Sequence, residues 1–472
     1  MKHTVMIILF VAVLTSCTPP VATTITSTST PVPTITPLTP TLAPTIEPTK
    51  TPGPTGAELQ SMNLDQLKAK YPELSKLTDP KNPASAVSEF TAAMGIKPED
   101  LGNLTPVLKM GPDGKPILGL TNTDGYPVII GIQQEDSTWI WDKPIIKSIT
   151  SVPFGCEALD GGNDELKFDI LRNVFNQWTV GSLDWKYASP TEAELDYPIQ
   201  EWYLEQAIKS NQPINFMHII YGNRDEIPDW LRNGNYSKEE LIVKMQDHIK
   251  GVMTKLRKIV DRRGSDIPIT YTVVNESVNA PSIFWNQRVG PEYVQLAFEA
   301  ARKADPKAIL LYNDYNHELP TQANARGVFE LVKKLKDQGL IDGVGMQMHF
   351  LRGDNINPNI PIDVLETGIR AQIDKYASIG LKTYITELDV DMSGISGTSE
   401  QKMQKAAQIY EMIARIASTN ENVALVSLWG VNSESSWINN LGGQREPALL
   451  FTNDKPQQTY YAVIKALFEN LK

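Results

Sequence analysis

The sequence predicts an α/β fold, a (β/α)8 TIM barrel, preceded by a disordered Thr/Pro-rich linker and a small N-terminal unit. Three observations favour it. The chain has 472 residues, 41% of them hydrophobic, which is enough for one barrel and a smaller unit. Short apolar runs alternate with amphipathic segments eight times after residue 148. Polar side chains end most of these runs, as at the mouth of a barrel.

The barrel is predicted over residues 148–472. Its eight strands are the apolar runs 152–158, 179–185, 213–221, 268–276, 308–313, 342–349, 382–389 and 423–430. Residues 237–263 show the helical pattern most clearly, because a Ser237 to Glu240 capping box precedes apolar residues at helical spacing. A strand followed by a helix, eight times over, predicts a closed parallel sheet.

Residues 1–16 have the layout of a signal peptide, with Lys2 before an apolar stretch at 5–14 that is too short to span a bilayer permanently. The small residues before Cys17 resemble a bacterial lipoprotein processing site. We therefore expect secretion, a lipid on Cys17 that binds the membrane, and localisation at the bacterial cell surface. The alternative is an ordinary secretory signal in which Cys17 is incidental. Because Cys156 is the other cysteine, a lipidated Cys17 leaves no pair for an intramolecular disulfide.

Two further regions precede the barrel. Residues 17–58 form the predicted linker, since 24 of the 38 residues at 18–55 are Thr or Pro and none is aromatic. Residues 59–147 are expected to form a small unit of unknown function, with a helical start near 64–71 and hairpin strands at 127–132 and 137–149.

The net charge of −11, from 55 acidic and 44 basic side chains, and the lack of a Lys/Arg-rich run argue against a nucleic-acid partner. The five histidines are scattered and no Cys/His/carboxylate cluster has ligand spacing, so no metal is predicted. The sequence also lacks a glycine-rich phosphate loop, and no cofactor is expected.

Two carboxylates stand at the ends of predicted strands four and seven: Glu276 and Glu387. Cleavage of a glycosidic bond requires one carboxylic acid that protonates the leaving oxygen and a second carboxylate that attacks the anomeric carbon or activates water. Strands four and seven lie roughly opposite across a barrel mouth, and carboxyl groups about 5 Å apart there indicate a retaining mechanism. The pair therefore predicts a glycoside hydrolase.

Five motifs in chain order resemble those of glycoside hydrolase family 10, the retaining endo-xylanases. They are Val273-Val274-Asn275-Glu276, Asn313-Asp314-Tyr315-Asn316, Gly345-Met346-Gln347-Met348-His349, Ile385-Thr386-Glu387-Leu388-Asp389 and Trp429-Gly430-Val431 with Ser436-Trp437. The resemblance covers residues 151–472. It implies a substrate that is xylan or a related β-1,4 polysaccharide, with Glu276 as the acid/base and Glu387 as the nucleophile.

The resemblance also implies roles for neighbouring residues. Asn275 is expected to bind the sugar 2-hydroxyl, while His349 and Asp389 support the nucleophile. The remaining residues are expected to bind substrate: His218, Tyr221, Gln347, Tyr315, Trp429 and Trp437. Tyr315 stacks on the leaving-group side or simply packs, and the sequence leaves both interpretations open.

The sequence departs from the family at two places. Residues 179–185 lack the usual Glu-Asn and Met-Lys-Trp pattern after strand two, and Tyr221-Gly222 replaces the usual Trp-His after strand three. Bond cleavage is thus expected to be intact while recognition of the glycone is altered. Two alternatives stay open: a related retaining hydrolase of another β-linked glycan, and a non-catalytic surface protein that binds glycans.

Overall fold

The computed structural model describes residues 105–122, 125–134, 139–142, 144–158, 165–181, 183, 185–189, 191–192, 198–223, 226–281, 283–353 and 355–471. The predicted signal peptide, Cys17, the linker and the helical start near 64–71 lie outside these residues. Of the described residues, no helix is both long and apolar enough to cross a membrane.

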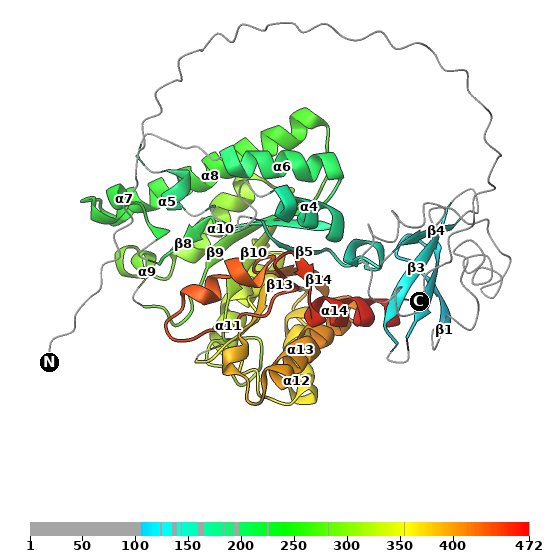
Figure 1. Ribbon diagram of the computed structural model, residues 1–472. Coiled ribbons are helices and arrows are strands. Elements are labelled where there is room, and N and C mark those ends of the chain that lie inside the picture. Colours follow the sequence, from blue (N-terminus) through cyan, green and yellow to red (C-terminus); the bar gives the residue numbers. More distant parts are fainter. Residues whose placement is uncertain are drawn as a thin grey trace, which may run out of the picture. The chain divides into compact units, whose positions relative to one another are not determined.

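Eight parallel strands form a closed barrel (Figure 1). In spatial order, each strand pairs with the next, and the pairing of β10 with β9 closes the sheet. This confirms the predicted (β/α)8 fold. The strands are β5 (Phe154–Glu157), β6 (Gln177–Val180), β7 (Ile214–Phe216), β9 (Ile269–Asn275), β10 (Ile309–Asp314), β11 (Gly343–Met346), β13 (Lys382–Val390) and β14 (Val423–Leu428).

Predicted strands three and six are each interrupted at their carboxyl ends. A short strand, β8 (Ile220–Tyr221), resumes beside β9, and β12 (His349–Phe350) resumes beside β13. The interruptions contain His218 and Gln347, and Met348 there has a positive φ of 62°. The Met217–His218 peptide bond is cis. The breaks in the ladder place polar side chains at the barrel mouth.

The prediction for strand two was wrong at its end, because β6 stops at Val180 and Trp185 begins a short helix, α5 (Trp185–Ala188). Trp185 is buried and stacks on His248, with ring centroids 4.1 Å apart and an interplanar angle of 7°. On another side it stacks on Trp285. Tertiary packing of an aromatic side chain therefore replaced the extended conformation.

The helices pack around the sheet. Predicted helix 237–263 is confirmed as α8 (Lys238–Arg263), where Ser237 and Glu240 form the capping box and Gly264 ends the helix in the left-handed conformation. The other α-helices are α4 (Glu165–Val174), α6 (Pro198–Ser210), α7 (Asp229–Asn233), α9 (Phe284–Arg288), α10 (Tyr293–Ala304), α11 (Ala325–Asp337), α12 (Ile362–Ala377), α13 (Ser399–Thr419) and α14 (Gln458–Glu469).

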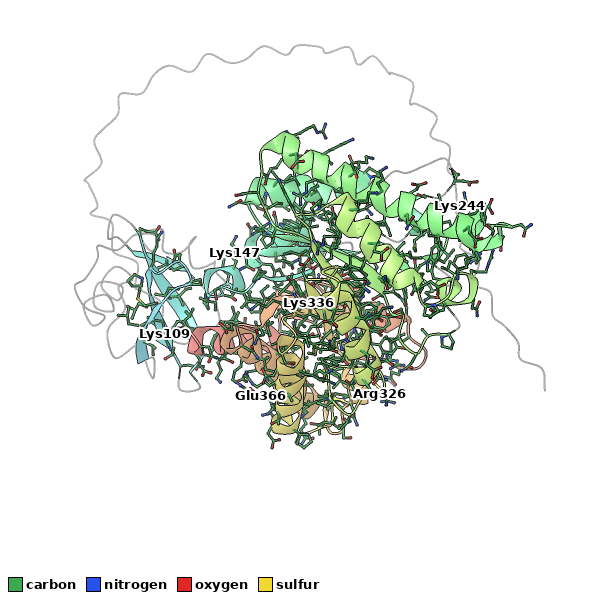
Figure 2. The ribbon with its side chains drawn as sticks, turned by 180° about the vertical axis from the view of Figure 1, so that it is seen from behind. Lys109, Lys147, Lys244, Arg326, Lys336 and Glu366 are labelled. Carbon is green, nitrogen blue, oxygen red and sulfur yellow. The ribbon has the colours of Figure 1, made fainter. Side chains whose placement is uncertain are left out.

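The helices bury apolar side chains against the strands and carry charged ones on the outside. Figure 2 labels several of these charged side chains, among them Glu366 on α12. Glu366 pairs with Arg370 on its own helix at 2.9 Å and with Arg415 on α13 at 2.7 Å. These ion pairs join two neighbouring helices, at a part of the barrel wall that carries no predicted site residue.

Residues before the barrel form a four-stranded antiparallel sheet in the order β1 (Thr105–Met110), β2 (Pro116–Thr121), β3 (Pro127–Gln133) and β4 (Trp139–Asp142). The predicted hairpin is present, but its second strand is shorter than expected, and residues 146–148 form a 3-10 helix instead. Lys109 donates to the backbone carbonyls of Glu469 and Leu471 at 3.0 and 3.1 Å, so the sheet contacts the end of α14.

Candidate active site

A pocket of about 550 Å³ lies at the carboxyl ends of the barrel strands. Ten of the predicted site residues line it, although they come from six barrel strands and the segments that follow them. The lining residues are His218, Tyr221, Glu226, Asn275, Glu276, Tyr315, Gln347, His349, Asn355, Glu387, Trp429 and Trp437. These predicted residues, which lie between His218 and Trp437 in the sequence, therefore converge on one site.

Glu387 is almost completely buried, with 4% of its surface exposed. Asn313 donates a hydrogen bond of 2.7 Å to its Oε1 atom, and His218 Nε2 lies 3.4 Å from the same atom. His349 Nε2 lies 3.3 Å from Oε2. Burial would raise the pKa of Glu387, but the two imidazoles outweigh it and lower the pKa to about 2. The carboxylate is thus held ionised, as a nucleophile requires.

The imidazole of His349 is fixed from its other side. Its Nδ1 atom lies 2.8 Å from Asp389 Oδ1, and the Trp437 indole donates to Asp389 Oδ2 at 2.6 Å. Burial opposes the charged form of His349, yet the carboxylates of Asp389 and Glu387 raise its pKa well above the usual value. Asp389 therefore fixes the orientation of the His349 imidazole and favours its cationic form, so that a positive charge lies beside Glu387. Asp389 is fully buried and acts from behind the pocket wall.

Glu276 occupies a different environment. It follows β9 in a left-handed conformation with φ of 51° and is more exposed than Glu387. The Tyr221 hydroxyl donates to its Oε2 atom at 2.6 Å, and the Gln347 amide donates to Oε1 at 2.8 Å. Glu276 therefore has uncharged donors, whereas Glu387 has two imidazoles. Two carboxyl groups in unequal environments are what an acid and a nucleophile need.

An amide network joins the two glutamates. Asn313 Nδ2 donates to Asn275 Oδ1 at 2.8 Å as well as to Glu387, and Asn275 Nδ2 lies 3.3 Å from Glu276 Oε1. Thr386 in turn donates to Asn313 Oδ1 at 2.7 Å, which fixes the orientation of that amide. The two carboxyl groups are thus held in a defined relation by buried side chains of β9, β10 and β13.

Sequence reasoning missed three residues of the site. Asn313 was quoted within a motif but given no role, and its contacts depend on β10 lying beside β9. Glu226 and Asn355 line the pocket from the segments after β8 and β12, where no local pattern singles them out. In contrast, none of the described residues between 177 and 192 lines the pocket, and this is the segment that lacks the usual strand-two pattern.

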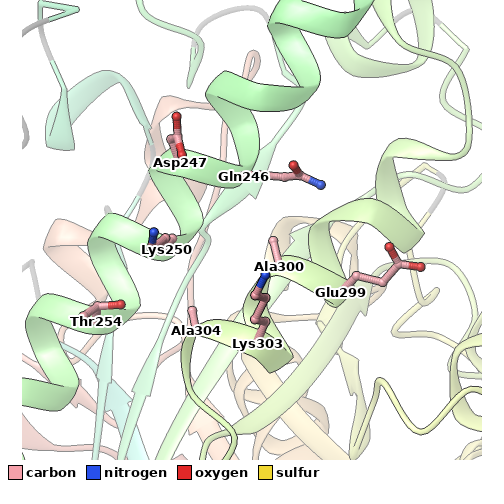
Figure 3. Close-up of a pocket in the computed structure, with 8 residues that line it drawn as sticks. All are labelled: Gln246, Asp247, Lys250, Thr254, Glu299, Ala300, Lys303 and Ala304. Carbon is pink, nitrogen blue, oxygen red and sulfur yellow. The ribbon is translucent and has the colours of Figure 1, made fainter.

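A second hollow, of about 500 Å³, lies between the outer helices α8 and α10 (Figure 3). Lys250 and Asp247 project from α8, while Lys303 and Glu299 project from α10. It lies among the outer helices rather than at the strand ends, and none of the motif residues lines it. In the described parts of the chain, no group of three or more His, Cys, Asp or Glu side chains has a metal-binding arrangement.

Comparisons with known proteins agree with this geometry. The model of the family described as glycosyl hydrolase family 10 matches residues 150–466. Endo-1,4-beta-xylanase B of Thermotoga neapolitana is 30% identical over 316 residues, which cover 65% of this chain and 85% of the relative. Endo-1,4-beta-xylanase A of Thermoanaerobacterium saccharolyticum is 31% identical over 291 residues, 58% of this chain but 23% of that relative.

Two solved structures are also similar. Native xylanase 10B from Thermotoga maritima has a TM-score of 0.59 and 29% identity, and the match covers 67% of this chain and 95% of that one. Xylanase 10B from Thermotoga petrophila RKU-1 in complex with xylobiose has a TM-score of 0.59 and 28% identity, with 68% and 95% covered. The matched family region includes the barrel and the pocket but not the four-stranded sheet.

Proposed function

The chain belongs to glycosyl hydrolase family 10, and we propose that it hydrolyses internal β-1,4-xylosidic bonds of xylan with retention of configuration. The observation that carries the proposal is the contrast between Glu276 and Glu387, which line one pocket but have different partners. The xylanase names of the similar proteins support xylan as the substrate.

The proposed reaction has two steps. Glu276 transfers its proton to the glycosidic oxygen, while Glu387 attacks the anomeric carbon, so that the glycosidic bond breaks and a covalent glycosyl ester forms. Glu276, now ionised, then takes a proton from water. The resulting hydroxide displaces Glu387 from the anomeric carbon and restores both carboxyl groups. Two inversions at one carbon retain its configuration.

The surrounding side chains suit an oxocarbenium-like transition state. His349, which is held by Asp389, keeps the Glu387 carboxylate ionised and oriented toward the anomeric carbon. Asn275 and Gln347 offer amides for sugar hydroxyls, and hydrogen bonds to the 2-hydroxyl strengthen as charge develops at the ring. Trp429 and Trp437 present aromatic surface on which sugar rings stack.

A second substrate class is favoured by one observation. The described residues between 177 and 192 contribute nothing to the pocket lining, so the region expected to bind the second glycone sugar is altered. This supports, as the alternative, a related retaining hydrolase of another β-linked glycan. The non-catalytic alternative is disfavoured, because the chain is a glycoside hydrolase by family and both glutamates face one pocket.

The test incubates the full chain with xylan, cellulose and glucomannan and measures new reducing ends, with the anomeric form of the first product followed by NMR. Glu387→Ala should abolish turnover on every substrate. Glu276→Ala should spare aryl glycosides with activated leaving groups, and azide should restore its rate. Glu239→Ala, on the exposed start of α8, is the matched control and should remain active. Equal loss for both variants on an aryl glycoside, without azide rescue, would contradict the assignment.

We also propose that the protein is a lipoprotein held at the bacterial surface through Cys17. The apolar stretch at 5–14, the small residues before Cys17 and the Thr/Pro-rich residues that follow support this proposal. A surface-held enzyme acts on a polymer too large to enter the cell. Xylan and the membrane are then its two partners.

A further inference from the structure

Two buried side chains of β10 lie next to the turn that carries the acid/base. Tyr312 and Asp314 have no exposed surface. They are two residues apart on one strand, so both point to the same side of the sheet, opposite to Asn313. The Tyr312 hydroxyl donates to Asp314 Oδ2. Neither residue lines the pocket, and the proposed reaction assigns them no role.

The Tyr312 hydroxyl binds the backbone immediately after Glu276. Its oxygen accepts hydrogen bonds from the amide of Ser277 at 3.0 Å and from the amide of Val278 at 3.2 Å. The Ser277 hydroxyl lies 3.0 Å from the same oxygen. Asp314 Oδ2 lies 3.4 Å from the Val278 amide as well. A single buried hydroxyl therefore satisfies two consecutive backbone N–H groups.

This turn decides where the Glu276 carboxyl group points. The backbone of Glu276 is left-handed, a conformation that a glutamate adopts only when its surroundings impose it. The Glu276 amide donates to the Asn313 carbonyl at 3.0 Å, and the next two amides bind Tyr312. The backbone amides of residues 276, 277 and 278 are thus all bound to groups of β10, the first to the Asn313 carbonyl and the next two to the Tyr312 hydroxyl.

Charge adds a second link between this pair and the acid/base. Burial raises the pKa of Asp314 to about 8, the hydrogen bond from Tyr312 opposes the rise, and the negative charge of Glu276 adds to it. The carboxyl groups of Asp314 and Glu276 therefore lie close enough to influence each other.

We propose that Tyr312 and Asp314 are positioning residues for the acid/base: they hold the turn at 276–278 so that the Glu276 carboxyl group stays aimed at the glycosidic oxygen. This inference rests on the proposed function. Its consequence is selective. Loss of the pair should harm proton donation, and it should leave attack by Glu387 on the opposite strand largely intact.

The experiment uses Tyr312→Phe, which keeps the ring and removes the hydroxyl. The matched control is Tyr203→Phe on α6, which removes another buried hydroxyl, one that donates to the Ala158 carbonyl at 2.6 Å, far along the chain from β10. The full chain and both variants are assayed on aryl xylobiosides whose leaving phenols span a range of acidity. Thermal unfolding is recorded for each protein.

Tyr312→Phe should lower kcat/KM by about tenfold or more on the least acidic phenol, since a general acid contributes about 10²- to 10⁴-fold there, and by less than about threefold on dinitrophenol. The plot of rate against leaving-group acidity then becomes steeper than in the wild type. Tyr203→Phe should keep the wild-type slope. The same loss on every phenol, or no loss, overturns the proposal.

Asp314→Asn keeps the shape of the side chain and provides the second variant. It should steepen the same plot, because an amide nitrogen cannot accept the hydrogen bonds that the two carboxyl oxygens of Asp314 accept from Tyr312, Val278 and Tyr315. If Tyr312→Phe fails to fold, this variant decides, and an unchanged slope overturns the proposal. An inactive wild-type protein would instead refute the proposed function, on which the inference rests.

Discussion

Replacement of His349 should raise the pH at which the enzyme loses activity in acid. His349 Nε2 lies 3.3 Å from Glu387, and together with His218 it lowers the pKa of the nucleophile. In the variant His349→Gln the cationic imidazole is replaced by a neutral amide. The ionised form of Glu387 is then less stable, and a protonated Glu387 cannot attack the substrate.

The magnitude follows from the shift in the pKa of Glu387. A change from 4.5 to about 2 corresponds to about 3 kcal/mol in favour of the ionised form. Because burial acts in the opposite direction, the two imidazoles together supply more than this amount. Loss of one of them should raise the pKa by about one unit or more. The same interaction stabilises the fold fully above pH 4.5, and this contribution is lost as the pH falls through about 2.

The assay measures kcat/KM between pH 3 and pH 7 on an aryl xylobioside with an activated leaving group, so that protonation by Glu276 does not limit the rate. Fluorescence at each pH verifies that the protein stays folded. Asp389→Asn is the companion variant: it keeps the imidazole but removes the carboxylate that charges it, and it should shift the acid limb in the same direction by less. A folded His349→Gln enzyme with the wild-type acid limb would refute this account of the nucleophile.

Three further outcomes are expected. Because the described residues of 177–192 do not line the pocket, the ratio of kcat/KM for aryl xylobioside to that for aryl xyloside should be about one to two orders of magnitude lower than in a relative with the full strand-two motif; ratios within a few-fold of each other would remove the argument. Trp437→Phe keeps an aromatic ring but removes the donor to Asp389, so kcat should fall by about tenfold with the loss of a charge-assisted hydrogen bond, and an unchanged kcat would show that the indole N–H is dispensable. Cys17→Ala should release the enzyme from membranes or block its processing, as judged by fractionation and mass spectrometry, and membrane association equal to that of the wild type would count against the lipoprotein proposal.

Some of the differences between the predicted and observed elements have a common physical cause. Strands three and six were predicted as continuous runs, but strand three is interrupted at His218 and strand six at Gln347. Both side chains line the pocket, and their backbone leaves the hydrogen-bonded ladder at the barrel mouth. The apolar residues after Val180 looked like the end of a strand. In the structure, Trp185 packs on His248, a residue 63 positions later, and no local pattern carries that information.

The sequence by itself determined the number and order of the strands, the helix capped by Ser237, and the two glutamates. These features depend on local periodicity and on the rule that polar residues at the strand ends of a parallel barrel share one face. The periodicity and the polar residues at strand ends can each be recognised within a short stretch of chain from the residue types alone.

Only the tertiary structure decided how the two glutamates differ. Glu276 follows β9 and Glu387 lies near the end of β13, and both are the same residue type, yet Glu276 has a tyrosine and an amide as partners and Glu387 has two imidazoles and Asn313. Closure of the barrel brings these groups together from different strands. The protonation preference of a carboxyl group depends on burial and on charges within a few ångströms, and such distances exist only after the sheet has closed.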